Sequence, residues 1–211
     1  MTMKNGFATL ALVAALGAFG TAAAAQDTAP AAAPAEAPAV PDMVLGQQDA
    51  PVTVMEYASY TCPHCADFHE QAFDKLKAEF IDTGKVKFVF REVYFDRYGL
   101  WASMMARCGG DMRYFGISDI LFDTQREWAG SSDPSVVVQN LKKIGRQAGM
   151  DDATIDQCMQ NGDMAQAMVA AYEANVKKDG VEGTPTIFVN GAKHSNMPYA
   201  DLKELIEAEL N

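Results

Sequence analysis

Basic residues are scarce in this sequence: 17 lysines and arginines stand against 28 aspartates and glutamates, a formal net charge of −11 at pH 7. The broad positive surface that binds nucleic acid is therefore absent, and so is a polybasic patch for a membrane surface. Cysteine and histidine are also scarce, with four and three residues, and there is no second C-x-x-C motif. Four closed ligands for a structural metal are hard to assemble from so few side chains.

The start of the chain is nearly free of charge, because Lys4 is the one charged residue among the first 25. Residues 6–25 form an almost uninterrupted run of apolar and small residues that ends in four alanines, which offer small-residue cleavage sites. This pattern predicts a cleaved secretory signal peptide over residues 1–25. An uncleaved anchor is the alternative, since the run is long enough to span a bilayer, although Ala and Gly make it only weakly hydrophobic.

Residues 26–41 lack any apolar side chain larger than valine and are rich in proline and alanine. Repeated proline favours extended conformations that build no core, so this stretch is predicted to be a disordered linker. A docking ligand for a partner is the alternative. The chain as a whole is 49% hydrophobic and 21% charged, which suits one globular domain of ordinary size, placed here at residues 42–211.

The first half of this domain predicts a strand, a helix and a second strand. Residues 43–46 are a possible edge strand, and residues 52–58 are β-branched and aromatic, as a strand favours. Apolar residues then recur at spacings of three and four up to Phe80, which indicates a helix face, and Gly84 ends the helix. Residues 86–93 form the next strand pattern, so the segment is predicted to be a βαβ unit with a right-handed crossover.

Between residues 98 and 178 the pattern changes to several helical segments, without a convincing strand. The chain returns to sheet at residues 186–189, where Asn190-Gly191 is a strong two-residue hairpin signal, and Pro198 opens a final helix. The sequence therefore predicts an α/β fold. A helical insertion over residues 98–178 separates its βαβ half from its ββα half.

Two cysteines, Cys62 and Cys65, lie where the first long strand pattern gives way to the helix pattern. Unpaired N–H groups and the positive dipole end of a helix start favour a thiolate there. Cys62 is predicted to be the attacking cysteine with its sulfur facing solvent, while Cys65, one turn later, is turned inward. His64 can stabilise the thiolate by charge or hydrogen bonding, and Pro63 fixes the turn without adding a donor. A low-pKa thiolate beside a second thiol is the working part of a disulfide exchanger.

A metal site is the alternative for this pair, with Cys62, Cys65 and either His64 or His69 as ligands of zinc or copper. The other two cysteines lie in the predicted insertion, and a thiolate bound to metal could not exchange disulfides. We therefore predict that the protein holds no metal and no other cofactor.

The stretch Glu56-Tyr57-Ala58-Ser59-Tyr60-Thr61-Cys62-Pro63-His64-Cys65 resembles the active-site strand and helix start of the DsbA-type thiol:disulfide oxidoreductases. Gly183-Thr184-Pro185-Thr186 resembles their cis-proline loop, and the resemblance spans roughly residues 44–210. It implies a thioredoxin-like fold. It also implies a cis Pro185 against the two sulfurs, with the Thr184 backbone as an edge for an extended substrate peptide. An ordinary proline at the start of an edge strand is the alternative.

Glu56 is an unusual residue in a strand otherwise suited to burial. If that strand is central in a sheet covered on both faces, the carboxylate is buried, where desolvation disfavours its charge. The resemblance gives Glu56 a role as an acid–base relay close to the buried Cys65. A glutamate that faces solvent from a sheet covered on one face is the alternative.

Cys108 and Cys158 form a second pair, 50 positions apart, each on a predicted helix of the insertion. In an oxidising compartment two such cysteines usually pair, and closing a loop of this size is worth about 4 kcal/mol in the chain-entropy model. We predict a structural disulfide, with two buried free thiols as the alternative. Not all members of the family carry such a pair, so a secondary redox role stays open.

Together these features predict a periplasmic protein that donates its Cys62–Cys65 disulfide to reduced, newly exported polypeptides through a mixed disulfide at Cys62. The resemblance implies reoxidation by a membrane quinone-linked partner like DsbB, and we expect a monomer. One alternative is a disulfide isomerase or reductase of the DsbC/DsbG kind, although those carry an N-terminal dimerisation domain for which the short Pro/Ala arm leaves no room. Another is a non-catalytic chaperone or metal-binding protein on the same fold.

Overall fold

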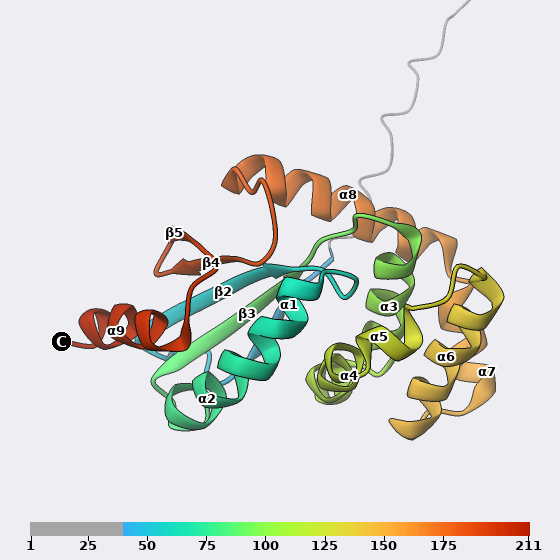
Figure 1. The fold of residues 1–211 in the computed structure, drawn as a ribbon, viewed down its shortest axis with the longest axis horizontal. Helices are drawn as coiled ribbons and strands as arrows, with labels where there is room; N and C mark the ends of the chain where they lie inside the picture. The colour runs from blue at the N-terminus through green and yellow to red at the C-terminus, as the bar shows by residue number, and fades with distance from the viewer. Residues whose placement is uncertain (1–39) are drawn as a thin grey trace, which may run out of the picture. The chain divides into compact units, whose positions relative to one another are not determined.

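The computed structural model describes residues 40–211, so the predicted signal peptide and nearly all of the predicted linker lie outside the described part. Its centre is a five-stranded sheet in the order β1-β3-β2-β4-β5 (Figure 1). The β2–β3 pair is parallel, and the other neighbouring pairs are antiparallel. The strands are β1 (Met43–Leu45), β2 (Val52–Ala58), β3 (Val86–Glu92), β4 (Thr186–Val189) and β5 (Ala192–Ser195). The predicted α/β layout is confirmed, and β2 is the middle strand.

One helix follows β2 and continues to Ile81, two residues before the Thr83-Gly84 turn that leads into β3. Its segments are α1 (Pro63–Phe68), η1 (His69–Phe73), α2 (Asp74–Leu76) and η2 (Lys77–Ile81), of which η1 and η2 are π-helical. The sequence predicts the helix and its end but not the π-helical segments, because the apolar spacing reads as an ordinary helix throughout. π-helical turns are rare and frequently occur at functional sites.

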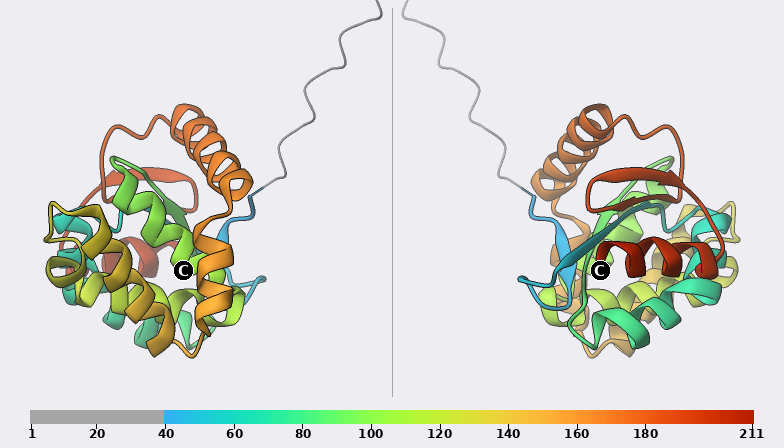
Figure 2. Two further views of the ribbon diagram at one scale, coloured as in Figure 1. Left: turned by 90° about the vertical axis from the view of Figure 1, so that its right-hand side faces the viewer. Right: turned by 90° about the vertical axis from the view of Figure 1, so that its left-hand side faces the viewer.

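Helices cover both faces of the sheet (Figure 2). On one face, Val52 and Val54 of β2 share the main core with apolar residues of α1 and η1 and with Leu202 of α9 (Tyr199–Glu209). On the other face, Tyr57 packs in a smaller cluster with Tyr172 of α8 (Gly162–Asp179). A strand that is both central and covered on two sides buries whatever side chains it carries, and this includes Glu56.

The helical insertion lies between β3 and β4 and begins next to the site cysteines. Asp96 caps its first helix, because its Oδ1 accepts hydrogen bonds from the N–H groups of Tyr98 and Gly99. Its helices are α3 (Arg97–Cys108), α4 (Asp111–Asp123), α5 (Gln125–Trp128), α6 (Pro134–Gln147), α7 (Asp152–Met159) and α8. No helix in residues 40–211 is both long and apolar enough to cross a membrane.

Two interactions stabilise the helical insertion, one within it and one between it and the sheet. Cys108 at the end of α3 and Cys158 in α7 are joined by a disulfide. Arg107 of α3 makes a paired contact with Glu92 at the end of β3, with nitrogen–oxygen distances of 2.8 and 2.6 Å. Glu92 also accepts a hydrogen bond from Tyr114 of α4. Because Glu92 is 7% exposed, this pair is protected from solvent and ties the sheet to the insertion.

Candidate functional site

The site is built on the turn between β2 and α1, where Cys62 is the last extended residue before the helix. The Cys62 N–H donates to the carbonyl of Ser59 at 3.0 Å, which closes the turn. The Cys62 carbonyl accepts the first helical hydrogen bonds, from the N–H groups of Cys65 and Ala66. Pro63 occupies the first helical position, where its missing N–H costs no helical hydrogen bond. Both sulfurs are therefore held at the positive end of α1.

The Cys62 sulfur is more enclosed than the sequence predicts, because the residue is 9% exposed rather than open to solvent. The Thr184 carbonyl lies 3.5 Å from this sulfur and covers one side of it. Cys65 is fully buried. The predicted order of exposure still holds: Cys62 keeps a narrow opening to solvent, whereas an attacking molecule cannot reach Cys65 directly.

The thiol of Cys62 is the group whose ionisation the fold favours, since its pKa is lowered from 9.0 to about 5. The largest cause is a hydrogen bond from the Cys65 thiol, and further bonds come from the Thr184 side chain and from the N–H groups of Cys65 and His64. Burial opposes these effects by raising the pKa. The hydrogen bonds outweigh burial, so Cys62 is a thiolate at neutral pH.

Cys65 behaves in the opposite way, because burial raises the pKa of its thiol far above the ordinary value. Its hydrogen bond to Cys62 and the negative charge of Glu56 raise the pKa further. The two cysteines therefore differ in ionisation. Cys62 holds the negative charge, and Cys65 holds a proton that must leave before its sulfur can react.

The ring of His64 lies outside this arrangement. Its side chain is 77% exposed, and its Nδ1 is 3.8 Å from the Asp67 carboxylate. The contribution of His64 to the thiolate comes from its backbone N–H rather than from the imidazole that the sequence pointed to. A backbone donor at a helix start is available from any residue except proline, so the identity of the side chain is not required for it.

The loop before β4 supplies the other side of the site. The Thr184–Pro185 peptide bond is cis. A groove of about 420 Å³ runs past this loop, lined by residues 182–186 and by Lys193 and His194 of β5. Thr184 and Pro185 thus lie between the Cys62 sulfur and an open groove, where an extended peptide has backbone groups to pair with.

Behind the cysteines, Glu56 forms a buried pair with His69, the first residue of η1. The Glu56 side chain has no exposed surface, and its Oε2 lies 3.2 Å from His69 Nε2. The second oxygen, Oε1, has no hydrogen-bond partner among the described residues. From the sequence, His69 is an alternative metal ligand, whereas in the structure its Nε2 contacts the carboxylate of Glu56.

Gln125 of α5 is a positioning residue that sequence reasoning missed. Its Nε2 donates to the carbonyls of Tyr60 and Cys62, both at 2.9 Å, and the residue is 7% exposed. The Tyr60 hydroxyl in turn bonds to Tyr114 and Ser118 of α4. Hydrogen bonds from the helical insertion therefore hold the turn that carries Cys62. No local motif marks such a residue, because its partners lie about 60 positions away and are backbone atoms.

Gln125→Leu is expected to destabilise the protein by about 1–3 kcal/mol, since it removes two buried hydrogen bonds to backbone carbonyls. Urea denaturation of the oxidised protein measures this. The matched control is Gln139→Leu on the exposed side of α6, which is expected to stay within about 0.5 kcal/mol of the unsubstituted protein. Equal losses in the two variants would show that the Gln125 amide does not hold the turn.

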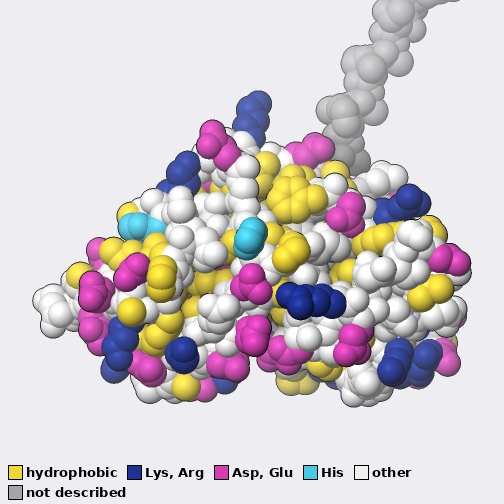
Figure 3. Space-filling view, viewed as in Figure 1, with side chains coloured by type: hydrophobic (Ala, Val, Ile, Leu, Met, Phe, Trp, Pro, Cys, Tyr) yellow, Lys and Arg dark blue, Asp and Glu magenta, His cyan; other side chains and the backbone are white. Residues whose placement is uncertain are grey.

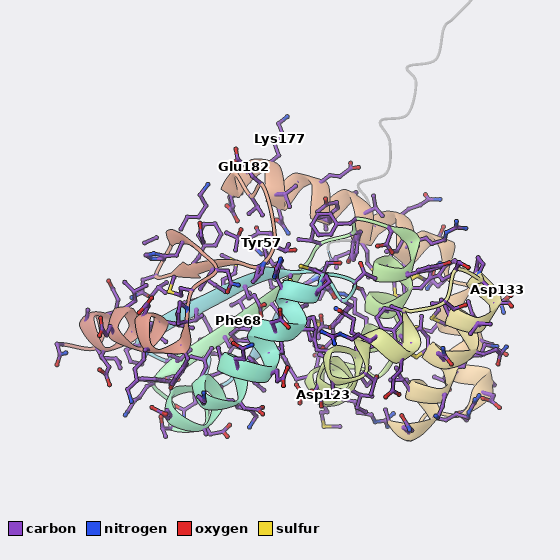
Figure 4. The ribbon with its side chains drawn as sticks, viewed as in Figure 1. Tyr57, Phe68, Asp123, Asp133, Lys177 and Glu182 are labelled. Carbon is purple, nitrogen blue, oxygen red and sulfur yellow. A yellow bond between two sulfur atoms is a disulfide. The ribbon has the colours of Figure 1, made fainter. Side chains whose placement is uncertain are left out.

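The face of the molecule seen in Figure 3 carries charges of both signs among apolar side chains. A groove of about 440 Å³ lies next to Pro63 and is bordered by α1 and by residues 122–127. Asp67 of α1, Glu70 of η1 and Asp123 at the end of α4 line it, and Figure 4 labels Asp123 below the helix that carries Phe68. Within residues 40–211, no three His, Cys, Asp or Glu side chains are gathered as metal ligands.

The sequence matches the family described as Thioredoxin over residues 39–208. Disulfide bond formation protein D of Bacillus subtilis (strain 168) is 31% identical over 178 residues, which cover 79% of this chain and 76% of that protein. A Rickettsia bellii protein named "Putative protein-disulfide oxidoreductase" is 34% identical over 167 residues, 79% of this chain. The chain spans 63% of the length of that Rickettsia relative.

Solved structures also superpose on this chain. Alpha-DsbA1 of Wolbachia pipientis superposes with a TM-score of 0.74 at 27% identity, covering 79% of this chain and 89% of that one. Oxidised BdbD of Bacillus subtilis superposes with a TM-score of 0.71 at 28% identity, covering 80% of this chain and 92% of that one. The predicted thioredoxin-like fold is therefore confirmed.

Proposed function

The chain belongs to the thioredoxin family, in the group that includes disulfide bond formation protein D, and we propose that it is a thiol:disulfide oxidoreductase that donates its Cys62–Cys65 disulfide to reduced, exported polypeptides. One observation carries this proposal. The fold lowers the pKa of Cys62 to about 5 while it raises the pKa of Cys65, its neighbour on the same helical turn. The thiolate stabilises the reduced pair relative to an ordinary dithiol, so the Cys62–Cys65 disulfide is passed on more readily.

The reaction begins when a substrate thiolate attacks the Cys62 sulfur of the oxidised protein. The Cys62–Cys65 bond breaks, its electron pair goes to Cys65, and a mixed disulfide joins Cys62 to the substrate. A second substrate thiolate then attacks the substrate sulfur and releases Cys62 as a thiolate. The substrate loses two electrons and two protons. Cys65 takes up one of these protons, with Glu56 as its buried relay, and the other proton goes to solvent.

The direction of transfer follows from the sign of the Cys62 shift. Because the pKa is lowered on folding, the thiolate stabilises the reduced form fully above pH 9, and this gain is lost as the pH falls through about 5. At pH 7, two units above the Cys62 pKa of about 5, the reduced form is stabilised by about 3 kcal/mol relative to a pair with an ordinary thiol. For a two-electron couple this raises the reduction potential by about 60 mV, toward the oxidising side. The pair is thereby tuned as a donor of disulfides.

The setting of this reaction is part of the proposal. We propose that residues 1–25 are a cleaved signal peptide, that residues 26–41 are a linker and that the domain works in the periplasm as a monomer. A membrane quinone-linked protein resembling DsbB would restore the disulfide. Thr184 and Pro185 would hold an extended substrate segment in the groove before β4, in support of which the Thr184 backbone lies beside the Cys62 sulfur.

Two assays on the mature protein test the proposal. Stoichiometric oxidised protein is expected to oxidise a dithiol peptide within seconds at pH 7, and the reduction potential of the Cys62–Cys65 couple is expected to lie above that of thioredoxin, about −270 mV. A potential near or below the thioredoxin value would assign the pair to reduction. Failure to oxidise the peptide would remove the proposed activity altogether and leave binding functions on this fold.

A further inference from the structure

The disulfide exchange described above gives Glu56 a role as a proton relay but leaves its pairing with His69 unexplained. Buried carboxylates are costly unless other groups compensate for the lost water. Glu56 has one polar side-chain partner among the described residues, His69, although a carboxylate accepts about four hydrogen bonds. The same fold could have placed an apolar residue at this position of β2, between Phe90 and Ile187 of the neighbouring strands.

The imidazole of His69 is fixed by packing rather than by polar contacts. Its ring stacks on Phe122 of α4 with centroids 3.9 Å apart and lies 4.6 Å from the ring of Phe73. The residue is 6% exposed, and its Nδ1 has no hydrogen-bond partner in residues 40–211. Nε2 is therefore the ring nitrogen through which His69 acts, and Glu56 Oε2 is the atom that it holds.

We propose that His69 is a positioning residue that anchors one oxygen of Glu56 and so reserves the other, Oε1, for the proton of Cys65. This inference rests on the proposed function, in which Cys65 must lose and regain a proton in each cycle. The negative charge of Glu56 raises the pKa of Cys65, so the carboxylate lies within electrostatic range of that thiol. A carboxylate with one oxygen anchored and the other free is poised to accept a proton in one orientation.

The step that depends on this arrangement is ring closure during reoxidation. The Cys65 thiol gives its proton to Glu56 Oε1, and its sulfur attacks the Cys62 sulfur of a mixed disulfide. The Cys62–Cys65 bond forms while the bond from Cys62 to the partner breaks, and the partner leaves as a thiolate with the electron pair. The two cysteines are oxidised and the partner disulfide is reduced, so atoms and electrons balance.

Glu56 of β2 contacts His69, Asp119 of α4 interacts with it electrostatically, and Cys65 of α1 lies four residues before it in the sequence. Burial raises the pKa of Asp119, and the nearby His69 opposes that shift. Asp119 thus responds to charge on the ring without hydrogen bonding to it. Asp119→Asn is therefore a control for charge acting through space, distinct from the held contact between His69 and Glu56.

The test measures ring closure as a function of pH. Reduced protein is mixed with oxidised glutathione to form the mixed disulfide at Cys62, and the release of glutathione is followed by acid quenching and mass spectrometry between about pH 5 and pH 9. His69→Phe keeps the aromatic packing and removes the donor. This variant is expected to slow ring closure about 10-fold at neutral pH, which is a fraction of the full effect of general acid–base catalysis. The pH profile of its closure rate is expected to move to higher pH.

A double-mutant cycle separates positioning from packing. In the Glu56→Gln background, His69→Phe is expected to slow closure no further, because the amide of glutamine cannot accept the proton of Cys65. His69→Gln, whose amide nitrogen can donate in place of Nε2, is expected to recover part of the rate. Phe73→Leu, which changes a ring contact of His69 without a polar atom, and Asp119→Asn are expected to keep the unsubstituted pH profile.

Three results would overturn the inference: closure in His69→Phe equal to that of the unsubstituted protein, the same further slowing in the Glu56→Gln background, or equal slowing by Phe73→Leu. If His69→Phe does not fold, His69→Gln and the double variant, which removes the unpaired carboxylate charge, still decide the matter. Failure of the proposed function is distinguishable, because it would be seen in the peptide oxidation and the reduction potential of the unsubstituted protein, whereas failure of this inference would be seen in the closure rates of the variants.

Discussion

Cys62→Ser is expected to abolish disulfide exchange, with a rate at least about 1,000-fold below that of the unsubstituted protein. A serine hydroxyl stays protonated at neutral pH, forms no disulfide and cannot accept the attack of a substrate thiolate. The measurement is the rate of dithiol peptide oxidation and of insulin reduction by the mature protein. Appreciable exchange in this variant would mean that the reactive sulfur lies elsewhere in the chain.

Cys65→Ser is the matched variant, because it keeps the Cys62 thiolate and removes the resolving sulfur. A serine hydroxyl at position 65 still donates toward Cys62, so the thiolate is retained in part. When this variant is mixed with an excess of a disulfide-bonded peptide, the Cys62 thiolate attacks the peptide disulfide, forms a mixed disulfide and releases a peptide thiolate. Without the Cys65 sulfur this mixed disulfide is expected to persist, and non-reducing electrophoresis detects it as a covalent complex with the peptide. Turnover equal to that of the unsubstituted protein would show that Cys65 does not resolve the intermediate.

Removing the second pair of cysteines is expected to have the largest effect on stability. The disulfide between Cys108 and Cys158 closes a loop with a sequence separation of 50. In the chain-entropy model this closure contributes about 4 kcal/mol, so Cys108→Ala/Cys158→Ala is expected to lower the free energy of unfolding by about that amount and the Tm by about 10 °C. Denaturation by urea and by heat measures the change.

The single variant Cys158→Ala serves as the control for this prediction. It opens the same loop with one substitution, so its loss of stability is expected to match that of the double variant. Both variants are expected to keep disulfide exchange at Cys62, because the bond links α3 and α7 rather than the active turn. A double variant within about 1 kcal/mol of the unsubstituted protein would show that the closed loop does not stabilise the fold.

The elements of this fold are predictable from the sequence because their signals are local. The alternation of β-branched residues in 52–58, the apolar spacing to Phe80 and the Asn190-Gly191 turn each act within a few residues. The βαβ unit accounts for the β2–β3 neighbours and the hairpin for the β4–β5 neighbours, whereas no local signal specifies the β1–β3 and β2–β4 pairings between distant segments. The π-helical segments escape prediction, because no spacing of apolar residues distinguishes them from an ordinary helix.

The site was predictable where chemistry is concentrated in one motif and unpredictable where distant segments meet. Cys62 and Cys65 stand together in the chain, and their placement at a helix start follows from the pattern around them. Gln125 acts on the turn from another helix, and the partner of Glu56 is a histidine 13 positions later. The enclosure of Cys62 likewise arises from the Thr184 loop, 122 residues away in the sequence.

Titration of the reduced, mature protein tests the central claim most directly. The ultraviolet absorbance of the thiolate, followed from acid to alkaline pH with Cys62→Ser as the blank, reports the ionisation of Cys62 alone. A midpoint near pH 5 is the predicted result, and Cys65 is expected to add no second step below alkaline pH. A midpoint close to the ordinary thiol value of 9.0 would contradict the account, because the reduced form would then gain no advantage over the disulfide.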